Sequence, residues 1–208
     1  MARPRQSLLT RQRIVDAAVA LADAEGLEAV SVRRLATELG VRGPSLYHHF
    51  ATKAEILEAV ADSIVAQVDL SPFATHDWPE ALRRWAYSYR DVLSAHPNIV
   101  PVIAHGPARR PAALAMADAV FGALIDAGWS EAHAVQIGAL MRYLVTGSAL
   151  GSFARGFEGD PQTYQRYPHL HRAPLLVEYG QCVDENAFTL GVETLIAGLE
   201  AMRVDHRG

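Results

Sequence analysis

SVRRLATELGVRGPSLYHHFATK (residues 31–53) is the stretch that decides the fold of this chain. Ser31 is a favourable N-cap residue, and the apolar residues after it recur at the three- and four-residue spacing of one helix face. Gly40 suits the left-handed conformation in which such a helix ends. Pro44 suits the first turn of a second helix, which we expect to run to about residue 50. The stretch therefore predicts two short helices joined by a tight turn.

A third helix is expected directly after this pair. Thr52 and Glu55 have the spacing of a capping box, in which the threonine caps the helix and the glutamate reaches back to it. A helix, a tight turn and a short second helix predict a helix-turn-helix, whose second helix enters the major groove of DNA. The alternative from spacing alone is an ordinary three-helix bundle with a solvated polar face.

The polar side chains of this stretch suit contact with DNA. Leu46 and Phe50, four residues apart, can face the core of the bundle. Arginine can bond a guanine edge with two hydrogen bonds, serine can donate or accept, and tyrosine, histidine and lysine suit phosphate oxygens. The side chains left to point outward are Arg33, Arg42, Ser45, Tyr47, His48, His49 and Lys53.

Two motifs extend this pattern over most of the first 57 residues. They are RIVDAAVALADAEGLEAVSVRRLATELGV (13–41) and PSLYHHFATKAEIL (44–57). With them, residues 10–57 closely resemble the DNA-binding domain of TetR-family transcriptional regulators. The resemblance implies a protein that binds double-stranded DNA. We expect Arg33, Arg42 and Ser45 to contact base edges, Pro44 to pack against a thymine methyl group, and Ser31, Tyr47, His48, His49 and Lys53 to hold phosphates.

Charge is unevenly distributed along the chain. Residues 1–53 hold eight Lys or Arg and five acids, whereas the whole chain of 208 residues has a net charge of −4. A basic end on an acidic body is expected of a protein that docks on DNA with one end. Residues 1–9 form a basic arm that we expect to be disordered.

The sequence shows no signal for export or for a membrane. Its N-terminus lacks the apolar run of a signal peptide, and no stretch is long enough to span a bilayer. Cys182 is the single cysteine, so no intrachain disulfide can form. We therefore expect a cytoplasmic protein with no membrane partner.

Every long periodic segment indicates helix, and no run of alternating polarity indicates a strand. The expected fold is all-α, with a three-helix helix-turn-helix head joined by a linking helix to a larger helical body. We place the head and its arm in residues 1–57, and the ligand-binding and dimerisation body in residues 58–208. Outside the helix-turn-helix, the expected helices span residues 10–25, 52–70, 78–95, 111–127, 130–157 and 184–203, with a polar loop at 156–170.

Two helices of the body have compositions typical of an interface. The helix at 130–157 is rich in small residues that let another helix approach closely, and the helix at 184–203 is apolar over more than one face. Two such helices from each of two subunits would form a four-helix bundle about a twofold axis. The alternative is that both lie in the core of a monomer, but a helix-turn-helix that reads palindromic half-sites favours a homodimer. The expected interface residues are Gly147, Gly151, Val192, Leu195, Ile196 and Leu199.

The body carries further motifs: AFTLGVETLIAGLEAM (187–202), His105-Gly106 after a proline-rich turn, and Gly128-Trp129 between helices. In these it resembles the ligand domain of the tetracycline-repressor type. The resemblance implies that a small-molecule effector binds within the helical body and moves the linking helix, so that the protein leaves a palindromic operator. An aromatic residue or methionine at helical spacing is more often core than pocket. The expected pocket residues are Trp85, Tyr89, His105, Met116, Phe121, Met141, Tyr143 and Phe153.

The polar partners of a tetracycline site are missing from this sequence. His105 matches the histidine through which tetracycline repressors hold a magnesium–drug chelate. Trp85 and Tyr89 replace an asparagine and a phenylalanine, and Arg155 falls near the position of a metal-associated glutamate. A magnesium ion requires oxygen ligands, and an arginine opposes it. We therefore expect an effector other than tetracycline, partly aromatic or apolar, with no metal and no other cofactor.

An enzyme is the alternative from a different class. His169 and His171, with His105 or the acids Asp184 and Glu185, could supply metal ligands. The chain has no HExxH motif, no glycine-rich phosphate loop and no nucleophile elbow, so we expect no catalytic residues. A transcriptional activator would use the same DNA contacts as a repressor, and the sequence does not separate the two.

Overall fold

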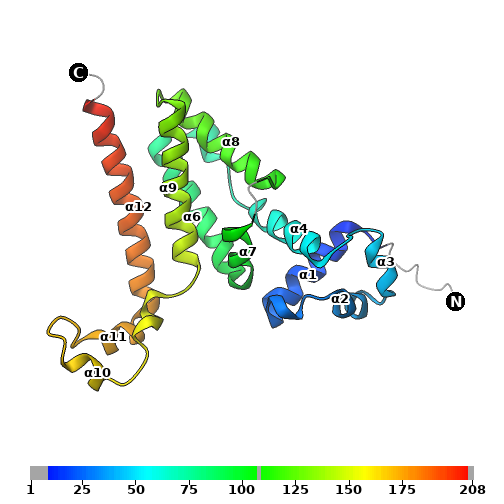
Figure 1. Cartoon of the computed structure of the whole chain (residues 1–208). Helices are drawn as coiled ribbons and strands as arrows, with labels where there is room; N and C mark the ends of the chain where they lie inside the picture. The colour runs from blue at the N-terminus through cyan, green and yellow to red at the C-terminus, as the bar shows by residue number, and fades with distance from the viewer. Residues whose placement is uncertain (1–8, 107–108, 206–208) are drawn as a thin grey trace. The chain divides into compact units, whose positions relative to one another are not determined.

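The computed structural model describes residues 9–106 and 109–205, and Figure 1 shows them as helices joined by connections. No strand occurs within these two ranges, which confirms the expected all-α fold. No helix of the described chain is both long and apolar enough to cross a membrane. In chain order the elements are α1 (Arg11–Glu25), η1 (Leu27–Ala29), α2 (Val32–Leu39), α3 (Gly43–Tyr47), α4 (Lys53–Val65), α5 (Pro72–Thr75), α6 (Trp78–Ala95), η2 (Pro97–Ile99), α7 (Val100–His105), α8 (Pro111–Asp126), α9 (Glu131–Ala149), η3 (Phe153–Phe157), α10 (Gln162–Gln165), α11 (Ala173–Glu178) and α12 (Gly180–Asp205).

The chain folds into two compact units, each of which combines two stretches of sequence. The first unit comprises Met1–Gln67 and Asn98–Leu114, and the second comprises Val68–Pro97 and Ala115–Gly208. The expected head lies within the first unit, which also contains the whole of α4 and α7. The grouping of α7 with the head is a long-range feature that no local sequence pattern indicated.

The caps of the head follow from its sequence. Ser31 Oγ accepts from the backbone N–H of Arg34 at 3.2 Å, and Gly40 has a φ of 65° at the end of α2. At the start of α4, Thr52 Oγ1 accepts from the N–H of Glu55 at 3.1 Å, and a carboxylate oxygen of Glu55 accepts from the N–H of Ala51 at 2.9 Å. The two short helices and the capping of the third are thereby confirmed. The second short helix ends at Tyr47, earlier than the expected residue 50.

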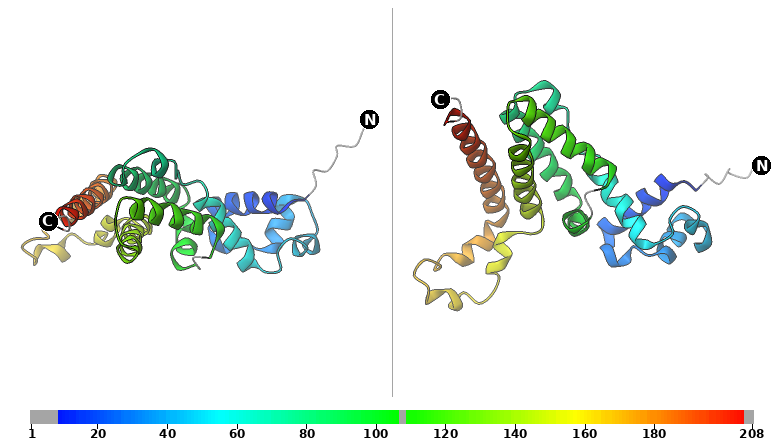
Figure 2. Two further views of the ribbon diagram at one scale, coloured as in Figure 1. Left: turned by 90° about the horizontal axis from the view of Figure 1, so that it is seen from above. Right: turned by 45° about the horizontal axis from the view of Figure 1, so that its top comes forward.

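The second unit is built on three long helices, α6, α9 and α12, which pack against one another, and α9 and α12 run side by side in both views of Figure 2. Glycines permit two close approaches in this unit. A Cβ at Gly138 would lie 2.5 Å from Cε1 of Phe121 on α8, and one at Gly191 would lie 3.0 Å from Cδ1 of Leu144. The small residues of α9 and α12 therefore serve packing within one chain as well as any contact with another chain.

The linking helix is shorter than expected, because α4 ends at Val65 rather than near residue 70. Beyond it, the N–H of Asp69 donates to Ser88 Oγ at 2.9 Å, and Asp69 Oδ1 accepts from the N–H of Ser71 at 2.9 Å. These two hydrogen bonds give the backbone N–H groups of Asp69 and Ser71 partners outside a helix. Such local side-chain bonds compete with the hydrogen bonds that would continue a helix. Bonding from Ser71 also lowers the pKa of the Asp69 carboxyl.

The prediction of one long helix over residues 130–157 is wrong at its C-terminal end. α9 stops at Ala149, and η3 begins at Phe153 after a break that contains Gly151. The N–H of Phe153 donates to Asp184 Oδ1 on α12 at 3.1 Å, so a tertiary contact replaces the helical one. The closing helix begins at Gly180, four residues before the expected start. The expected polar loop contains the short helix α10.

Arg83 joins α6 to α12 through ion pairs on both helices. Its Nε and Nη2 lie 2.8 and 2.9 Å from the carboxylate oxygens of Glu193, and its Nη1 lies 2.6 Å from Glu80. The guanidinium hydrogen bonds hold the pKa of the Glu193 carboxyl below its usual value. This pair links residues 110 positions apart in the sequence.

Glu193→Gln is expected to lower the free energy of unfolding at pH 7 by about 1 kcal/mol or less, because the pair is partly exposed to solvent. A carboxyl whose pKa is lower in the folded state adds stability above its unfolded pKa, and this addition is lost as pH falls through the folded pKa. The unfolded pKa of glutamate is about 4.3. Urea titrations above and below that pH should give a difference from wild type that shrinks in acid, while Glu200→Gln on the same helix serves as the charge control. A constant difference would contradict the assigned pair.

Candidate functional site

Arg11 on α1 contacts the residues that directly follow α3. The Nη1 of Arg11 donates to the backbone carbonyl of His49 at 2.7 Å, and its guanidinium carbon lies 3.9 Å from the centre of the Phe50 ring. Phe50 is 2% exposed and Leu46 is fully buried, as expected from their spacing. These contacts hold the outer face of α3 on a rigid support. Arg11 was missed by sequence reasoning, since its partner lies 38 residues away.

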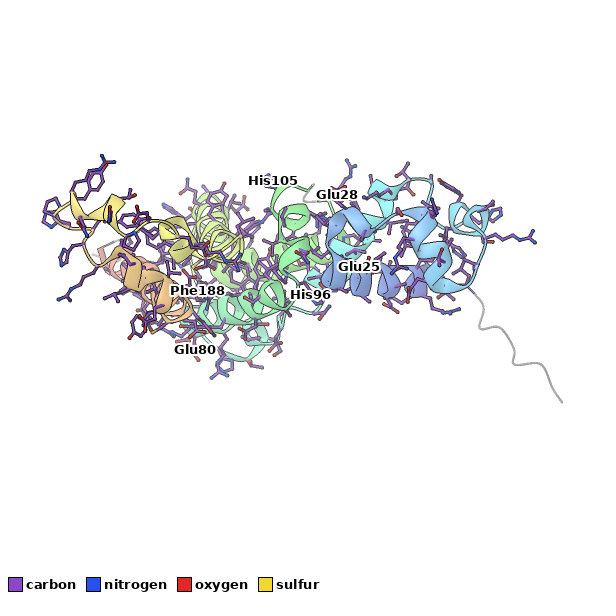
Figure 3. All side chains as sticks on the ribbon, turned by 90° about the horizontal axis from the view of Figure 1, so that it is seen from below. Glu25, Glu28, Glu80, His96, His105 and Phe188 are labelled. Atoms are coloured by element: carbon purple, nitrogen blue, oxygen red, sulfur yellow. The ribbon has the colours of Figure 1, made fainter. Side chains whose placement is uncertain are left out.

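Two neighbouring arginines on α2 have different surroundings. Arg34 Nη2 lies 2.7 Å from Glu25 on α1, which Figure 3 labels, and Arg34 Nη1 lies 3.7 Å from Glu38. Hydrogen bonding and charge from Glu25 raise the pKa of Arg34. Arg33 is exposed and forms no ion pair with any residue that the structure describes. Of the two, Arg33 is therefore the one available to a partner outside the chain.

The other residues expected to contact bases lie at the turn and the first part of α3. Arg42 is the N-cap residue of α3 and is exposed, with no ion-pair partner in the described part of the chain. Pro44 is exposed and Ser45 is half-buried. Together with Arg33 they offer hydrogen-bond donors and one apolar ring to a neighbouring molecule. Their contact with bases stays a prediction.

The residues expected to hold phosphates vary in exposure. The oxygen of Ser31 accepts the capping bond of α2, which leaves its O–H to donate. Tyr47 is 56% exposed, His48 is exposed and His49 is half-buried. Lys53 Nζ donates to the backbone carbonyl of Leu27 at 3.3 Å. Lys53 therefore also supports the connection after α1, a structural role that its sequence position did not indicate.

Most of the expected pocket residues lie in the second unit. Trp85 and Tyr89 are buried on α6, with ring centroids 5.9 Å apart and ring planes at 35°. The indole N–H of Trp85 is buried without a hydrogen-bond partner in the described structure. A buried donor of this kind favours a ligand that brings an acceptor. Met116 and Met141 are buried as well.

Three of the expected pocket residues are placed elsewhere. His105 belongs to the first unit, where it ends α7, is exposed, and has its Nδ1 2.9 Å from the carbonyl of Pro101 (Figure 3). Tyr143 and Phe153 are 71% and 65% exposed. Both lie on the surface, because the opposite face of α9 carries its buried residues and Phe153 follows the end of that helix. This corrects their expected position inside the body.

The histidines considered as metal ligands are not gathered. His169 is exposed, and exposed His171 has its Nδ1 3.0 Å from the carbonyl of Pro168. Among the described residues no group of three or more His, Cys, Asp or Glu side chains is arranged to hold a metal ion.

An apolar groove runs along the outer face of α9 and α12, and we call it the α9–α12 groove. Its volume is about 530 Å³. Leu190 is 69% exposed and Leu140 is 44% exposed, so large apolar side chains face solvent. Contiguous exposed apolar surface of this kind marks an interaction site. The groove is lined by Leu140, Tyr143, Leu144, Ala187, Leu190, Gly191, Thr194 and Leu195.

The residues expected at the dimer interface divide between this surface and the core. Leu195 lines the α9–α12 groove, and Gly147 and Gly151 are exposed with open space around them. Val192, Ile196 and Leu199 are buried within the second unit, at 0%, 1% and 7% exposure. These three therefore face the core of their own chain, and Leu140, Tyr143 and Leu190 hold the exposed positions.

The two parts of the sequence match two family models. Residues 14–60 match the family described as bacterial regulatory proteins, tetR family. Residues 72–203 match the family described as tetracyclin repressor-like, C-terminal domain. The matches correspond to the helix-turn-helix head and to the helical body.

Comparisons with individual proteins agree with these two family matches. The chain is 31% identical to the class C tetracycline repressor protein of Escherichia coli over 94% of its length and 93% of the repressor. It is 34% identical to an HTH-type transcriptional regulator of Saccharopolyspora erythraea, over 68% of its own length and 60% of the length of that protein. Among solved structures, ActR of Streptomyces coelicolor in complex with actinorhodin is similar at a TM-score of 0.74 and 28% identity, covering 94% of this chain and 98% of ActR.

Proposed function

The chain belongs to the TetR family of bacterial transcriptional regulators, and we propose that it is a homodimeric repressor that leaves a palindromic operator when a small molecule binds its body. Members of this family regulate transcription and are not enzymes. The homodimer, the repressor role, the operator and the effector are the parts that we propose.

The observation that carries the proposal is the outer face of the helix-turn-helix. Arg33 and Arg42 are exposed and have no ion-pair partner in the described structure, whereas Arg34 between them in sequence is held by Glu25 and Glu38. Arginine on a rigid helix face is the side chain that reads guanine edges in the major groove. The ties of Arg11 to the end of α3 supply the rigid support.

The α9–α12 groove supports the homodimer. Its exposed leucines and tyrosine are costly to leave in water, and a second copy of the same helices offers a matching apolar surface. A twofold dimer places two identical heads for two half-sites of a palindrome. Each operator complex would then contain two copies of the helix-turn-helix.

The proposal is tested by binding to DNA and by transcription. Purified protein is titrated against the fragment upstream of its own gene and against duplexes selected from a random pool, at two salt concentrations with competitor DNA. We expect saturable, competitor-resistant binding that weakens with salt, and a palindrome among the selected duplexes. Transcription in vitro from a promoter that contains the selected site should fall when the protein is added. An increase, or failure to select any site, would overturn the repressor.

We further propose that the effector is a largely aromatic molecule with an acceptor atom for the indole N–H of Trp85. The buried pair Trp85 and Tyr89 supports an aromatic ligand, and the unpartnered N–H supports an acceptor. ActR, a similar protein, was solved with actinorhodin, and another relative is named for tetracycline. In the described part of the chain no group of three or more His, Cys, Asp or Glu side chains is arranged to hold a metal ion, which supports an effector that binds without magnesium.

Isothermal titration with tetracycline and magnesium chloride tests this assignment. We expect no saturable heat at micromolar protein, because Trp85 stands where tetracycline repressors have an asparagine and Arg155 would repel the metal. Tetracycline without magnesium is the control titration. Tight binding that disappears when magnesium is removed would contradict the metal-independent effector.

A further inference from the structure

A hollow of about 480 Å³ lies at one end of the second unit, where the turn between α8 and α9 meets the last turn of α12 (Figure 1). It is lined by residues 126–130 of that turn, by His133 and by Arg203, all of which belong to the second unit. Small-molecule sites usually have volumes of roughly 300–1,000 Å³. None of the residues expected to line the effector pocket lines this hollow, so it is a separate candidate site.

The turn that forms the hollow has a well-defined backbone. Gly128 has a φ of 93°, and the backbone N–H of Trp129 donates to the carbonyl of Leu124 at 3.1 Å, which closes the end of α8. Ser130 Oγ accepts from the N–H of His133 at 3.2 Å and caps the start of α9. Both helix ends are therefore held by hydrogen bonds, and the side chains of the turn are carried on a rigid connection.

Trp129 brings a hydrogen-bond donor without a partner to this hollow. The residue is 8% exposed, and its buried indole N–H forms no hydrogen bond with any residue that the structure describes. Trp78 and His133 pack against the ring in edge-to-face contacts, with centroids 5.7 and 5.9 Å away. A buried N–H has already lost its water, so a ligand acceptor that reaches it gains a hydrogen bond without removing water from the donor.

Arg203 on the last turn of α12 brings a positive charge. Its Nη2 donates to the carbonyl of Ala127, and a Cβ on Gly128 would lie 3.6 Å from the same nitrogen, so the guanidinium lies against the turn. Arg203 is half-buried, and within residues 9–106 and 109–205 it forms no ion pair and no other hydrogen bond. The remaining N–H groups of a guanidinium match the two oxygens of a carboxylate. The N-terminus of α9 adds partial positive charge at the same place.

The charges around the hollow favour a ligand with a single negative charge. Asp126, exposed at the end of α8, is the only acid among the described residues that line it. Its repulsion of a ligand grows with the charge of that ligand, so a doubly charged phosphate is disfavoured relative to a carboxylate. The indole ring of Trp129 offers an apolar surface to the rest of such a molecule.

We propose that this hollow binds a small organic carboxylate, whose oxygens accept hydrogen bonds from Arg203 and from the indole N–H of Trp129. The inference goes beyond the proposed function and does not depend on it, because the site needs neither DNA nor a second subunit. A bound carboxylate would join the last turn of α12 to the turn between α8 and α9. Binding to the folded chain alone would therefore raise the thermal stability of the protein.

Nuclear magnetic resonance of the indole N–H groups tests the site directly. The full chain labelled with ¹⁵N has three tryptophans, and the indole signal of Trp129 is the one missing from Trp129→Phe. Benzoate is the probe, and benzamide is its uncharged control of similar shape. We expect a saturable downfield shift of the Trp129 signal with benzoate at millimolar concentration and none with benzamide. A shift of the Trp85 signal alone would place benzoate in the effector pocket and overturn the site, as would the absence of any shift.

Two charge substitutions should change the affinity for benzoate in opposite directions. Arg203→Gln removes the charged partner and should weaken binding by at least about tenfold. Asp126→Asn removes the repulsion and should tighten binding by about threefold. Because Asp126 is exposed, this variant keeps the test valid if Arg203→Gln fails to fold. Asp118→Asn is the matched control, since Asp118 is exposed on the same helix but does not line the hollow.

The control separates a site from a general effect of charge. Asp118→Asn should leave the affinity for benzoate at the wild-type value. Equal tightening by Asp118→Asn and Asp126→Asn would show a response to net charge and refute the carboxylate site. Wild-type affinity in both Asp126→Asn and a folded Arg203→Gln protein would refute it as well. Benzoate should raise the melting temperature of wild type and not that of Arg203→Gln.

Discussion

Leu190→Asp is expected to convert the dimer into a monomer and to abolish tight binding to a palindromic operator. Leu190 is 69% exposed in one chain and lines the α9–α12 groove. In a twofold interface the substitution appears twice, and it places two carboxylates in apolar surroundings without partners. Losing the second head removes the gain from simultaneous contact, so affinity for the full site should fall by at least about 100-fold.

Sedimentation and DNA titration of the same samples measure both effects. Val135→Asp is the matched control, because Val135 is 51% exposed on α9 but does not line the groove. It should remain a dimer and keep wild-type affinity. A Leu190→Asp protein that stays dimeric would show that the two subunits meet through another surface. A monomer that keeps full affinity would instead refute the role of dimerisation in operator binding.

Arg33→Ala is expected to cost about 1–3 kcal/mol of binding free energy at one base position and to relax sequence preference there. Arg33 is exposed and its guanidinium has no ion-pair partner in the described structure, so it can form two hydrogen bonds to a guanine edge. Duplexes selected from a random pool with the variant should show no base preference at one pair of positions, one in each half-site of the palindrome. Loss spread evenly over all sequences would contradict base contact by this residue.

Two neighbouring residues make controls for this measurement. Lys53→Met should weaken binding to all sequences alike and reduce the salt slope by about 0.9 per head, which is the signature of a lost phosphate contact. Arg34→Ala breaks the ion pairs with Glu25 and Glu38, so it should affect stability without altering base preference. Because Lys53 also donates to the carbonyl of Leu27, the thermal stability of the Lys53→Met protein must be measured beside its affinity for DNA.

The helix-turn-helix could be predicted because its signals are local. Ser31 and Thr52 lie within three residues of the N–H groups that they cap, and Gly40 lies at the turn that it permits. Hydrophobic spacing placed Leu46 and Phe50 in the core correctly. Element ends were less predictable, because tertiary bonds such as that from Phe153 to Asp184 compete with helix continuation.

The orientation of helices in the body could not be predicted in the same way. α9 is rich in small residues and α12 is apolar on more than one face, so spacing alone did not show which face of each helix is covered within the chain. Val192 and Ile196 proved to be buried, while Leu190 and Tyr143 proved to be exposed. The choice depends on which neighbouring helix each face meets, and such contacts join residues far apart in the sequence.

By itself the sequence determined the all-α class, the helix-turn-helix and its caps, and the resemblance to TetR-family regulators, because each depends on residues a few positions apart. Tertiary structure alone decided that α7 belongs with the head, that Arg11 supports α3, and that Arg110 joins Glu58 to α7. Helix propensity and capping act within one turn, whereas burial and ion pairing depend on which distant segments fold together.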